Sequence, residues 1–151
     1  VLNPVGNNVG IGIVNPTNKL HVAGGVSATA FVAISDRNAK EDFAPVAARD
    51  VLNKVLALPV STWKFKELQD GRHMGPMAQD FHAAFGLGGS DTTITTVDSD
   101  GVALAAIQGL NQKVNSENAA LRADNAELKQ RLEALEKIIH HQKNNQQRAQ
   151  P

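Results

Sequence analysis

The feature that most constrains this chain is a heptad repeat that fills its last third. Apolar residues and asparagine recur three and four residues apart, which places them along one side of a helix. The predicted a positions are Leu104, Asn111, Asn118, Asn125, Leu132 and Ile139, and the d positions are Ile107, Val114, Leu121, Leu128, Leu135 and Gln142. No proline follows residue 102 before Pro151, and strong helix formers predominate. We therefore expect one long coiled-coil helix over residues 102–151, ending in a polar tail.

Charged residues beside the repeat indicate how the helices of this coil pair. In a parallel, in-register coiled coil, a g residue faces the e residue five positions later in a neighbouring helix. Each of the three g-to-e pairs here is opposite in charge: Glu117 with Arg122, Asp124 with Lys129, and Arg131 with Glu136. The signs therefore favour a parallel, in-register assembly of identical chains.

Asparagine at a positions and a glycine are two unusual features of the predicted C-terminal helix. Asparagine at three successive a positions, residues 111, 118 and 125, is typical of parallel dimers, so periodicity alone leaves a dimer or a trimer open. Gly109 lies inside the predicted helix, where glycine costs roughly 1 kcal/mol relative to alanine. We expect Gly109 to mark a close contact with the globular part of the chain.

Residues 35–101 have the pattern of a small mixed α/β domain. Apolar spacing predicts a helix over 49–59 and another over 76–86, where Gly86 is the expected stop. Alternation predicts a half-buried strand over 61–67, and the run TTITTV over 92–97 predicts a second strand that ends in a turn at 98–101. We expect α+β packing around the aromatic residues Trp63, Phe65, Phe81 and Phe85.

Residues 1–34 carry strand and turn signals instead. Val9, Ile11 and Ile13 alternate with glycine, and Leu20 and Val22 alternate before a pair of glycines. A β segment of this length cannot bury enough apolar area to fold alone. We interpret it as the end of a β-structured fibre stalk, stabilised by identical neighbours, and the chain as part of a longer protein.

Composition excludes several classes of function. Acidic and basic residues number 15 each, so the chain lacks the positive charge that binds nucleic acid. No run approaches the roughly 18 apolar residues needed to span a bilayer. Without cysteine there is no thiolate chemistry, and the pair His140–His141 has no third ligand nearby. We expect no nucleic acid, no membrane, no metal and no cofactor.

The segment SDRNAKED, residues 35–42, raises a question of chemistry. Ser35 followed by polar residues is what a helix N-cap looks like, and the segment alone favours that interpretation. Ser35 with Lys40 five residues later is also compatible with a nucleophile and its base. The segment directly follows an apolar run, residues 31–34.

Three blocks in order resemble one family. SDRNAKEDF, RHMGPMAQDF and GVALAAIQGLNQKV are similar to successive signatures of the peptidase S74 domain, the C-terminal intramolecular chaperone of phage tail spikes and endosialidases, which also occurs in bacterial tail-fibre-like proteins. NVGIGIVNPTNKLHVAG resembles the repeat often found just upstream of that domain. The resemblance implies a homotrimer that assembles and folds an upstream fibre and then cuts itself off.

The resemblance also assigns residues. It implies that Ser35 is the nucleophile, that Lys40 is the lysine of a Ser/Lys dyad, and that the scissile bond is Ile34–Ser35. A lysine amine acts as a base only where burial or nearby positive charge favours its neutral form, so we expect Lys40 to be partly desolvated. Asp36 or Asp80 could orient the lysine or a water, and Asp36 is equally plausible as a cap.

The implied reaction is a single-turnover serine-peptidase reaction in which the chain cuts itself. Many members have arginine where this chain has Asn38 and a larger apolar residue where it has Ala39, which bears on the rate of cutting. The alternative is a structural end cap that trimerises the fibre and never cuts. A membrane-tethered transcription-factor segment, as in myelin regulatory factor, is disfavoured because basic and membrane-spanning runs are lacking.

The resemblance divides the chain into three parts. Residues 1–34 are the stalk end, 35–101 the chaperone and autoprotease domain, and 102–151 the coiled-coil helix. The implied partners are two further copies and the upstream fibre domains of the same chain. The implied location is a phage virion tail or a bacterial surface or extracellular fibre, with maturation in the host cytoplasm.

Overall fold

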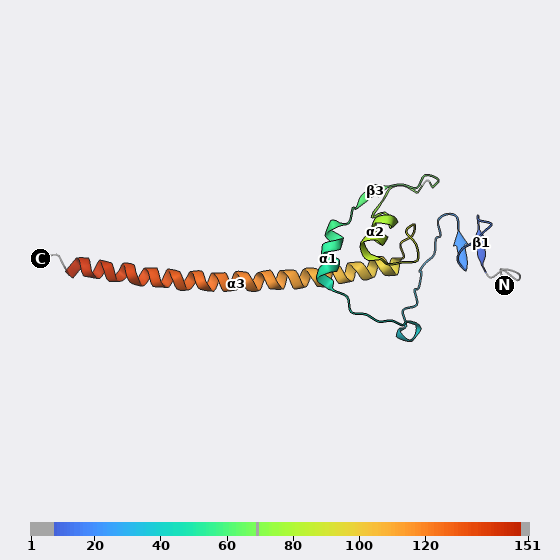
Figure 1. The fold of residues 1–151 in the computed structure, drawn as a ribbon. Helices are drawn as coiled ribbons and strands as arrows, with labels where there is room; N and C mark the ends of the chain where they lie inside the picture. Colours follow the sequence, from blue (N-terminus) through green and yellow to red (C-terminus); the bar gives the residue numbers. More distant parts are fainter. Residues whose placement is uncertain (1–7, 69, 149–151) are drawn as a thin grey trace. The chain divides into compact units, whose positions relative to one another are not determined.

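The computed structural model describes residues 8–68 and 70–148 (Figure 1). Its elements, in chain order, are β1 (Val9–Ile11), β2 (Leu20–Val22), the 3-10 helix η1 (Arg37–Ala39), α1 (Ala48–Ala57), β3 (Ser61–Trp63), β4 (His73–Gly75), α2 (Ala78–Phe85) and α3 (Thr96–Arg148). This confirms an α+β chain with small sheets and a long C-terminal helix. Residues 1–7 of the expected stalk and 149–151 of the polar tail lie outside the described residues.

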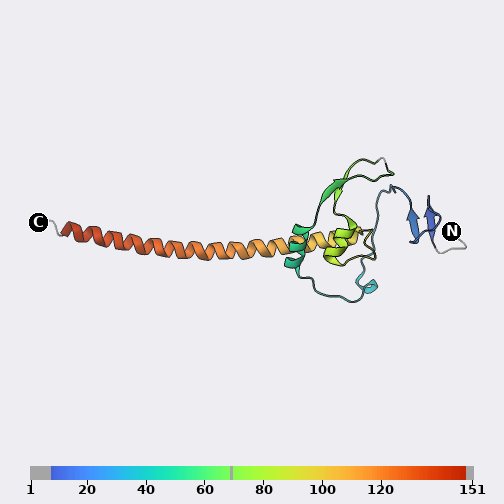
Figure 2. The same ribbon diagram turned by 45° about the horizontal axis from the view of Figure 1, so that its top comes forward.

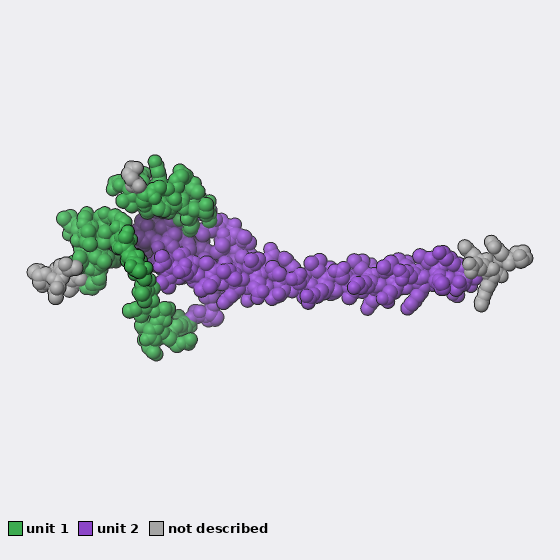
Figure 3. Space-filling view, turned by 180° about the vertical axis from the view of Figure 1, so that it is seen from behind, with its two compact units in different colours: residues 1–43, 60–76 green, residues 44–59, 77–151 purple. Residues whose placement is uncertain are grey.

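The chain forms two compact units (Figure 3). Unit 1 contains residues 1–43 and 60–76, and unit 2 contains residues 44–59 and 77–151. The division into stalk, chaperone domain and coiled coil remains a prediction.

Unit 1 contains two sheets of two strands each. Strands β1 and β2 pair in parallel, with Val9 opposite Leu20 and Ile11 opposite Val22. Strands β3 and β4 pair in antiparallel fashion, with Trp63 opposite His73. The expected strands are thus present at 9–11, 20–22 and 61–63, each shorter than the sequence pattern.

An aromatic cluster joins β3 to β4 in unit 1. The ring centroids of Trp63 and Phe65 are 4.9 Å apart, and that of His73 lies 4.8 Å from Trp63. The Arg72 guanidinium donates to the Thr62 hydroxyl at 2.6 Å across the same pair of strands. Stacking and this hydrogen bond therefore hold a hairpin that has only three residues in each strand.

In unit 2, α1 lies across α3, as both ribbon views show (Figures 1 and 2). The contact buries Ala48 and Leu52 of α1 against Val102, Ala106 and Gly109 of α3.

A Cβ at position 109 would collide with the backbone carbonyl of Ala48 and would lie 3.0 Å from the Cβ of Leu52. The absence of a side chain at Gly109 lets the two helices approach this closely. The expected close contact at Gly109 is confirmed.

Helix α2 packs in unit 2 through its aromatic residues. Phe81 is buried, and its ring centroid is 4.9 Å from that of Phe85. Gly86 ends the helix in the left-handed conformation, with φ of 64°, as its position predicted. The four aromatic residues expected in one core thus form two pairs, with Trp63 and Phe65 in unit 1 and Phe81 and Phe85 in unit 2.

The predicted strand at 92–97 and the turn at 98–101 are wrong. Residues 92–95 form no strand, and α3 already begins at Thr96. The Thr95 hydroxyl accepts a hydrogen bond from the Asp98 backbone N–H at 3.1 Å, and the Asp98 carboxylate lies in the first helical turn. This side-chain cap starts the helix and outweighs the β propensity of the threonines.

Candidate active site

The segment that carries the expected dyad folds into one short 3-10 turn. Asp36 is the N-cap of η1, and its Oδ1 accepts a hydrogen bond from the Asn38 backbone N–H at 2.9 Å. The Asn38 side-chain amide donates to the same oxygen at 3.2 Å. Asp36, rather than Ser35, is therefore the cap, and the Ser35 hydroxyl is available for another partner.

That partner is Lys40. Its Nζ donates to Ser35 Oγ at 2.6 Å, across the five residues that separate them in the chain. Lys40 is the C-cap of η1 with an extended backbone, and its N–H bonds to the Arg37 carbonyl. The turn thus brings together the two residues of the expected dyad. The same separation lets a neutral amine accept the hydroxyl proton.

The bond expected to break lies directly beside this pair. Residues 31–36 form no helix or strand, and Ile34 is 84% exposed. Its carbonyl carbon is joined to the nitrogen of Ser35, so nucleophile and target belong to adjacent residues. Such proximity supplies a large part of the rate in an intramolecular reaction.

The solvent exposure of the dyad residues differs from what we expected. Ser35, Asp36 and Lys40 are all exposed in the single chain, whereas Lys40 was expected to be partly desolvated. A lysine amine acts as a base only in its neutral form, which dry surroundings favour. The single chain therefore has the geometry of the dyad without the dry surroundings that the chemistry needs.

The two carboxylates proposed to orient the lysine belong to different compact units. Asp36 is committed to the cap of η1 by two hydrogen bonds. Asp80 lies in the first turn of α2, in unit 2, whereas Ser35 and Lys40 belong to unit 1.

Sequence reasoning missed a contact that closes this loop. The Arg37 guanidinium carbon lies 5.9 Å from the ring centroid of Phe43, within the range of a cation–π contact. Between them, Asp42 has φ of 55°, a left-handed backbone that aspartate tolerates better than most residues. An arginine and a phenylalanine six residues apart around an aspartate give only a weak sequence signal for such a closure.

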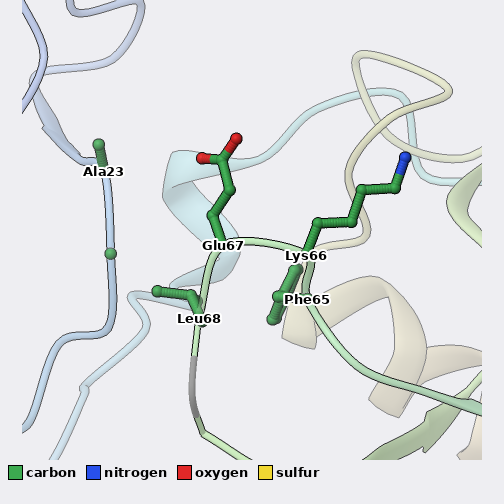
Figure 4. A pocket seen from close by; sticks show the side chains of 6 residues that line it. Ala23, Phe65, Lys66, Glu67 and Leu68 are labelled. Atoms are coloured by element: carbon green, nitrogen blue, oxygen red, sulfur yellow. The ribbon is translucent and has the colours of Figure 1, made fainter.

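A pocket elsewhere in unit 1 has no comparable chemistry (Figure 4). It is lined by Ala23, Gly24 and the segment 65–68, and in the close-up the Lys66 amine and Glu67 carboxylate point apart. Within residues 8–68 and 70–148, no group of three His, Cys, Asp or Glu side chains could hold a metal ion. Over the same ranges, no helix is both long and apolar enough to span a bilayer.

Helix α3 leaves an apolar stripe exposed. The residues that α1 covers, Val102, Ala106 and Gly109, fall at the f and c positions of the heptads. The a and d residues are left open, with Leu104 64% exposed and Leu128 61% exposed. We call this exposed a and d stripe from Leu104 to Ile139 the seam.

Comparison with known proteins bears on the same residues. Residues 35–87 match the family Peptidase_S74, described as chaperone of endosialidase, and the match begins at Ser35. No curated protein matches the chain. This segment of the chain, which contains the Ser35–Lys40 pair, is therefore similar to the peptidase S74 family of endosialidase chaperones.

Proposed function

We propose that this chain is an intramolecular chaperone that trimerises the fibre upstream of it and then releases itself by cutting the Ile34–Ser35 bond. The observation that carries the proposal is the 2.6 Å contact between Lys40 Nζ and Ser35 Oγ, at the first residue of the family match. The family match over residues 35–87 supports a chaperone-like role, and cutting and trimer formation are the further steps that we propose.

Assembly rests on the seam. Apolar side chains such as Leu121, Leu128 and Leu135 are more than half exposed in the single chain. Burying one such side chain stabilises by about 1.5–3 kcal/mol, so a seam of this length strongly favours helix association. Three parallel copies would cover it, and the opposite charges at g and e would keep the copies in register.

The chemical steps need only the chain and water. The neutral Lys40 amine takes the Ser35 hydroxyl proton while Oγ attacks the Ile34 carbonyl carbon. The tetrahedral intermediate breaks its C–N bond, and the ammonium of Lys40 returns the proton to the Ser35 nitrogen. An ester then joins Ile34 to Ser35 Oγ. Water hydrolyses it to the Ile34 carboxylate and the Ser35 hydroxyl.

Exposure of the pair makes assembly the step that permits cutting. In the single chain, both Ser35 and Lys40 face water. Packing against neighbouring copies would dry the pair and favour the neutral amine. Cutting would then report that the fibre had assembled.

The alternative is a structural end cap that trimerises the fibre and never cuts. The test is intact mass and a denaturing gel on the parent and on Ser35→Ala after prolonged incubation of the assembled protein. We expect the parent to yield a C-terminal piece that begins at Ser35 and Ser35→Ala to stay whole and assembled. A parent that stays at full length at every pH would support the end cap.

A further inference from the structure

Unit 2 contains an apolar groove that the dyad and the seam do not use. Its volume is about 350 Å³. Apolar side chains from the start of α1, the end of α2 and the first turns of α3 form most of its wall: Val46, Val51, Phe85, Leu87, Val97 and Val102. Lys54 and Asp98 add one charge of each sign.

The same chain exposes a matching apolar segment. Phe31, Val32 and Ile34 are 75%, 90% and 84% exposed, and Ala33 lies between them. Four consecutive exposed apolar residues are unusual on a soluble surface and indicate a contact site. The segment ends at the proposed scissile bond, so whatever covers it also decides the surroundings of that bond.

The position of the groove on α3 indicates which copy supplies the segment. Val97 and Gly101 of its wall fall at a and e positions when the heptads are continued toward the start of α3. In a parallel coiled coil, the e flank of one helix faces the neighbouring chain. The a and e edge of the groove, at Val97 and Gly101, would therefore face a second copy in such a coiled coil.

The charges near the apolar segment and on the groove wall also favour this segment as the occupant of the groove. Asp36 and Arg37 follow the apolar segment after Ser35, in the order acid then base. The groove wall carries Lys54 and Asp98, which offer one opposite charge to each. With the apolar segment in the groove, the start of η1, which carries these two charges, would lie near complementary partners.

We propose that Phe31–Ile34 of one copy lies in the α1–α3 groove of a neighbouring copy. The inference rests on the proposed trimer and extends it, because a neighbouring copy would then contact the residues beside the scissile bond. Seating Ile34 in a neighbour brings protein surface against Ser35 and Lys40, which are exposed in the single chain. The neighbour would thereby supply the desolvation that the lysine needs.

Cysteine crosslinking tests this directly, because the chain contains no cysteine of its own. In a Ser35→Ala background, which keeps the segment attached, one chain carries Phe31→Cys and a differently tagged chain carries Leu87→Cys. The two are assembled together and oxidised with diamide. Because seating raises the effective concentration of the two thiols, we expect about tenfold more linked heterodimer than with a control chain carrying Asn53→Cys. Asn53 is exposed on α1 and lies outside the groove wall.

Three other outcomes would overturn the proposal, and each has a different meaning. A linked product only in the double variant Phe31→Cys/Leu87→Cys, within one chain, means that each segment fills its own groove. Assembled trimers with no more heterodimer than the Asn53 control mean that the groove is not the docking site. Chains that sediment as single copies mean that the proposed assembly itself is wrong. Far-ultraviolet circular dichroism of each variant confirms that the helices are retained.

Discussion

At the scale of single residues, the roles within SDRNAKED are divided by hydrogen bonding. Asp36 caps the turn, and Lys40 contacts Ser35 Oγ at 2.6 Å. A serine used as a cap would have its oxygen occupied by backbone N–H groups. The division therefore leaves the Ser35 hydroxyl to the Lys40 amine, as the proposed dyad requires.

The base can be tested at Lys40. Lys40→Ala should slow cutting by at least roughly 10²-fold, the usual effect of losing a general base. Lys40→Arg should not restore cutting, because the guanidinium keeps its proton. In the parent, the rate should rise with pH because only the neutral amine accepts a proton. Quantitative gels from pH 6 to 10 measure this, and equal rates for parent and Lys40→Arg would exclude Lys40 as the base.

The cap can be tested at Asp36. Asp36→Ala removes the acceptor for the Asn38 N–H and should cost about 1 kcal/mol of local order, or roughly fivefold in the cutting rate. Asp36→Asn keeps a capping oxygen and should cut at nearly the parent rate. If Asp36→Asn were as slow as Asp36→Ala, the carboxylate charge rather than the cap would be what matters.

Much of this site could be predicted from the sequence, and part of it could not. The resemblance named Ser35, Lys40 and the scissile bond, and the structure brings the two side chains together. The exposure of Lys40 was not predicted, since a sequence does not show what a single chain leaves uncovered. The Arg37–Phe43 contact depends on a left-handed residue at Asp42, which has no strong sequence signal.

At the scale of elements, the proposed assembly would give α3 two purposes on different faces. Its c and f residues hold α1, while its a and d residues form the seam. A helix that used the same face for both could not bind α1 and other copies together. The separation lets the chain fold its globular part without blocking assembly.

Gly109 allows a test of the α1–α3 contact. Gly109→Ala places a methyl group against the backbone carbonyl of Ala48, which cannot swing aside as a side chain can. The clash should outweigh the helix propensity gained and lower the free energy of unfolding by roughly 1–2 kcal/mol.

Gly101→Ala is the matched control, because nothing lies within 4 Å of its added Cβ. It should raise the free energy of unfolding by up to about 1 kcal/mol. Urea denaturation at one fixed protein concentration measures both variants. A stabilised Gly109→Ala would show that the helices do not pack this closely in solution.

Helices were predicted better than strands for a physical reason. Helix α2 ended at Gly86 as expected, because the left-handed glycine stop is local. The threonine run before α3 predicts a strand, but the Thr95 hydroxyl accepts a hydrogen bond from the Asp98 N–H and so caps a helix there. The predicted single aromatic core is wrong because residues 60–76 and 77–85 belong to different compact units, and periodicity along a chain does not reveal such a division.

At the scale of the whole molecule, flanking charges should set the register of the assembly. Replacing Arg122 and Lys129 by Glu creates like charges in two g-to-e pairs and should weaken association mainly at low salt, since exposed charges are screened within about 10 Å at 0.1 M. Adding Glu117→Lys and Asp124→Lys restores opposite signs and should restore association. Sedimentation equilibrium at low and high salt measures both. Equal association of all variants at low salt would contradict the parallel register.

The central claim, that assembly permits cutting, is tested most directly by breaking the seam far from the dyad. Leu121→Asp with Leu128→Asp places charges at two d positions, while Ala119→Asp with Ala126→Asp places the same charges at b positions outside the seam. The measurement is the fraction cut at Ile34–Ser35 by intact mass, with the oligomeric state of each sample from sedimentation. We predict that the seam variant stays unassembled and uncut, whereas the b-position variant assembles and cuts like the parent. Cutting at the parent rate by the unassembled seam variant would contradict the account.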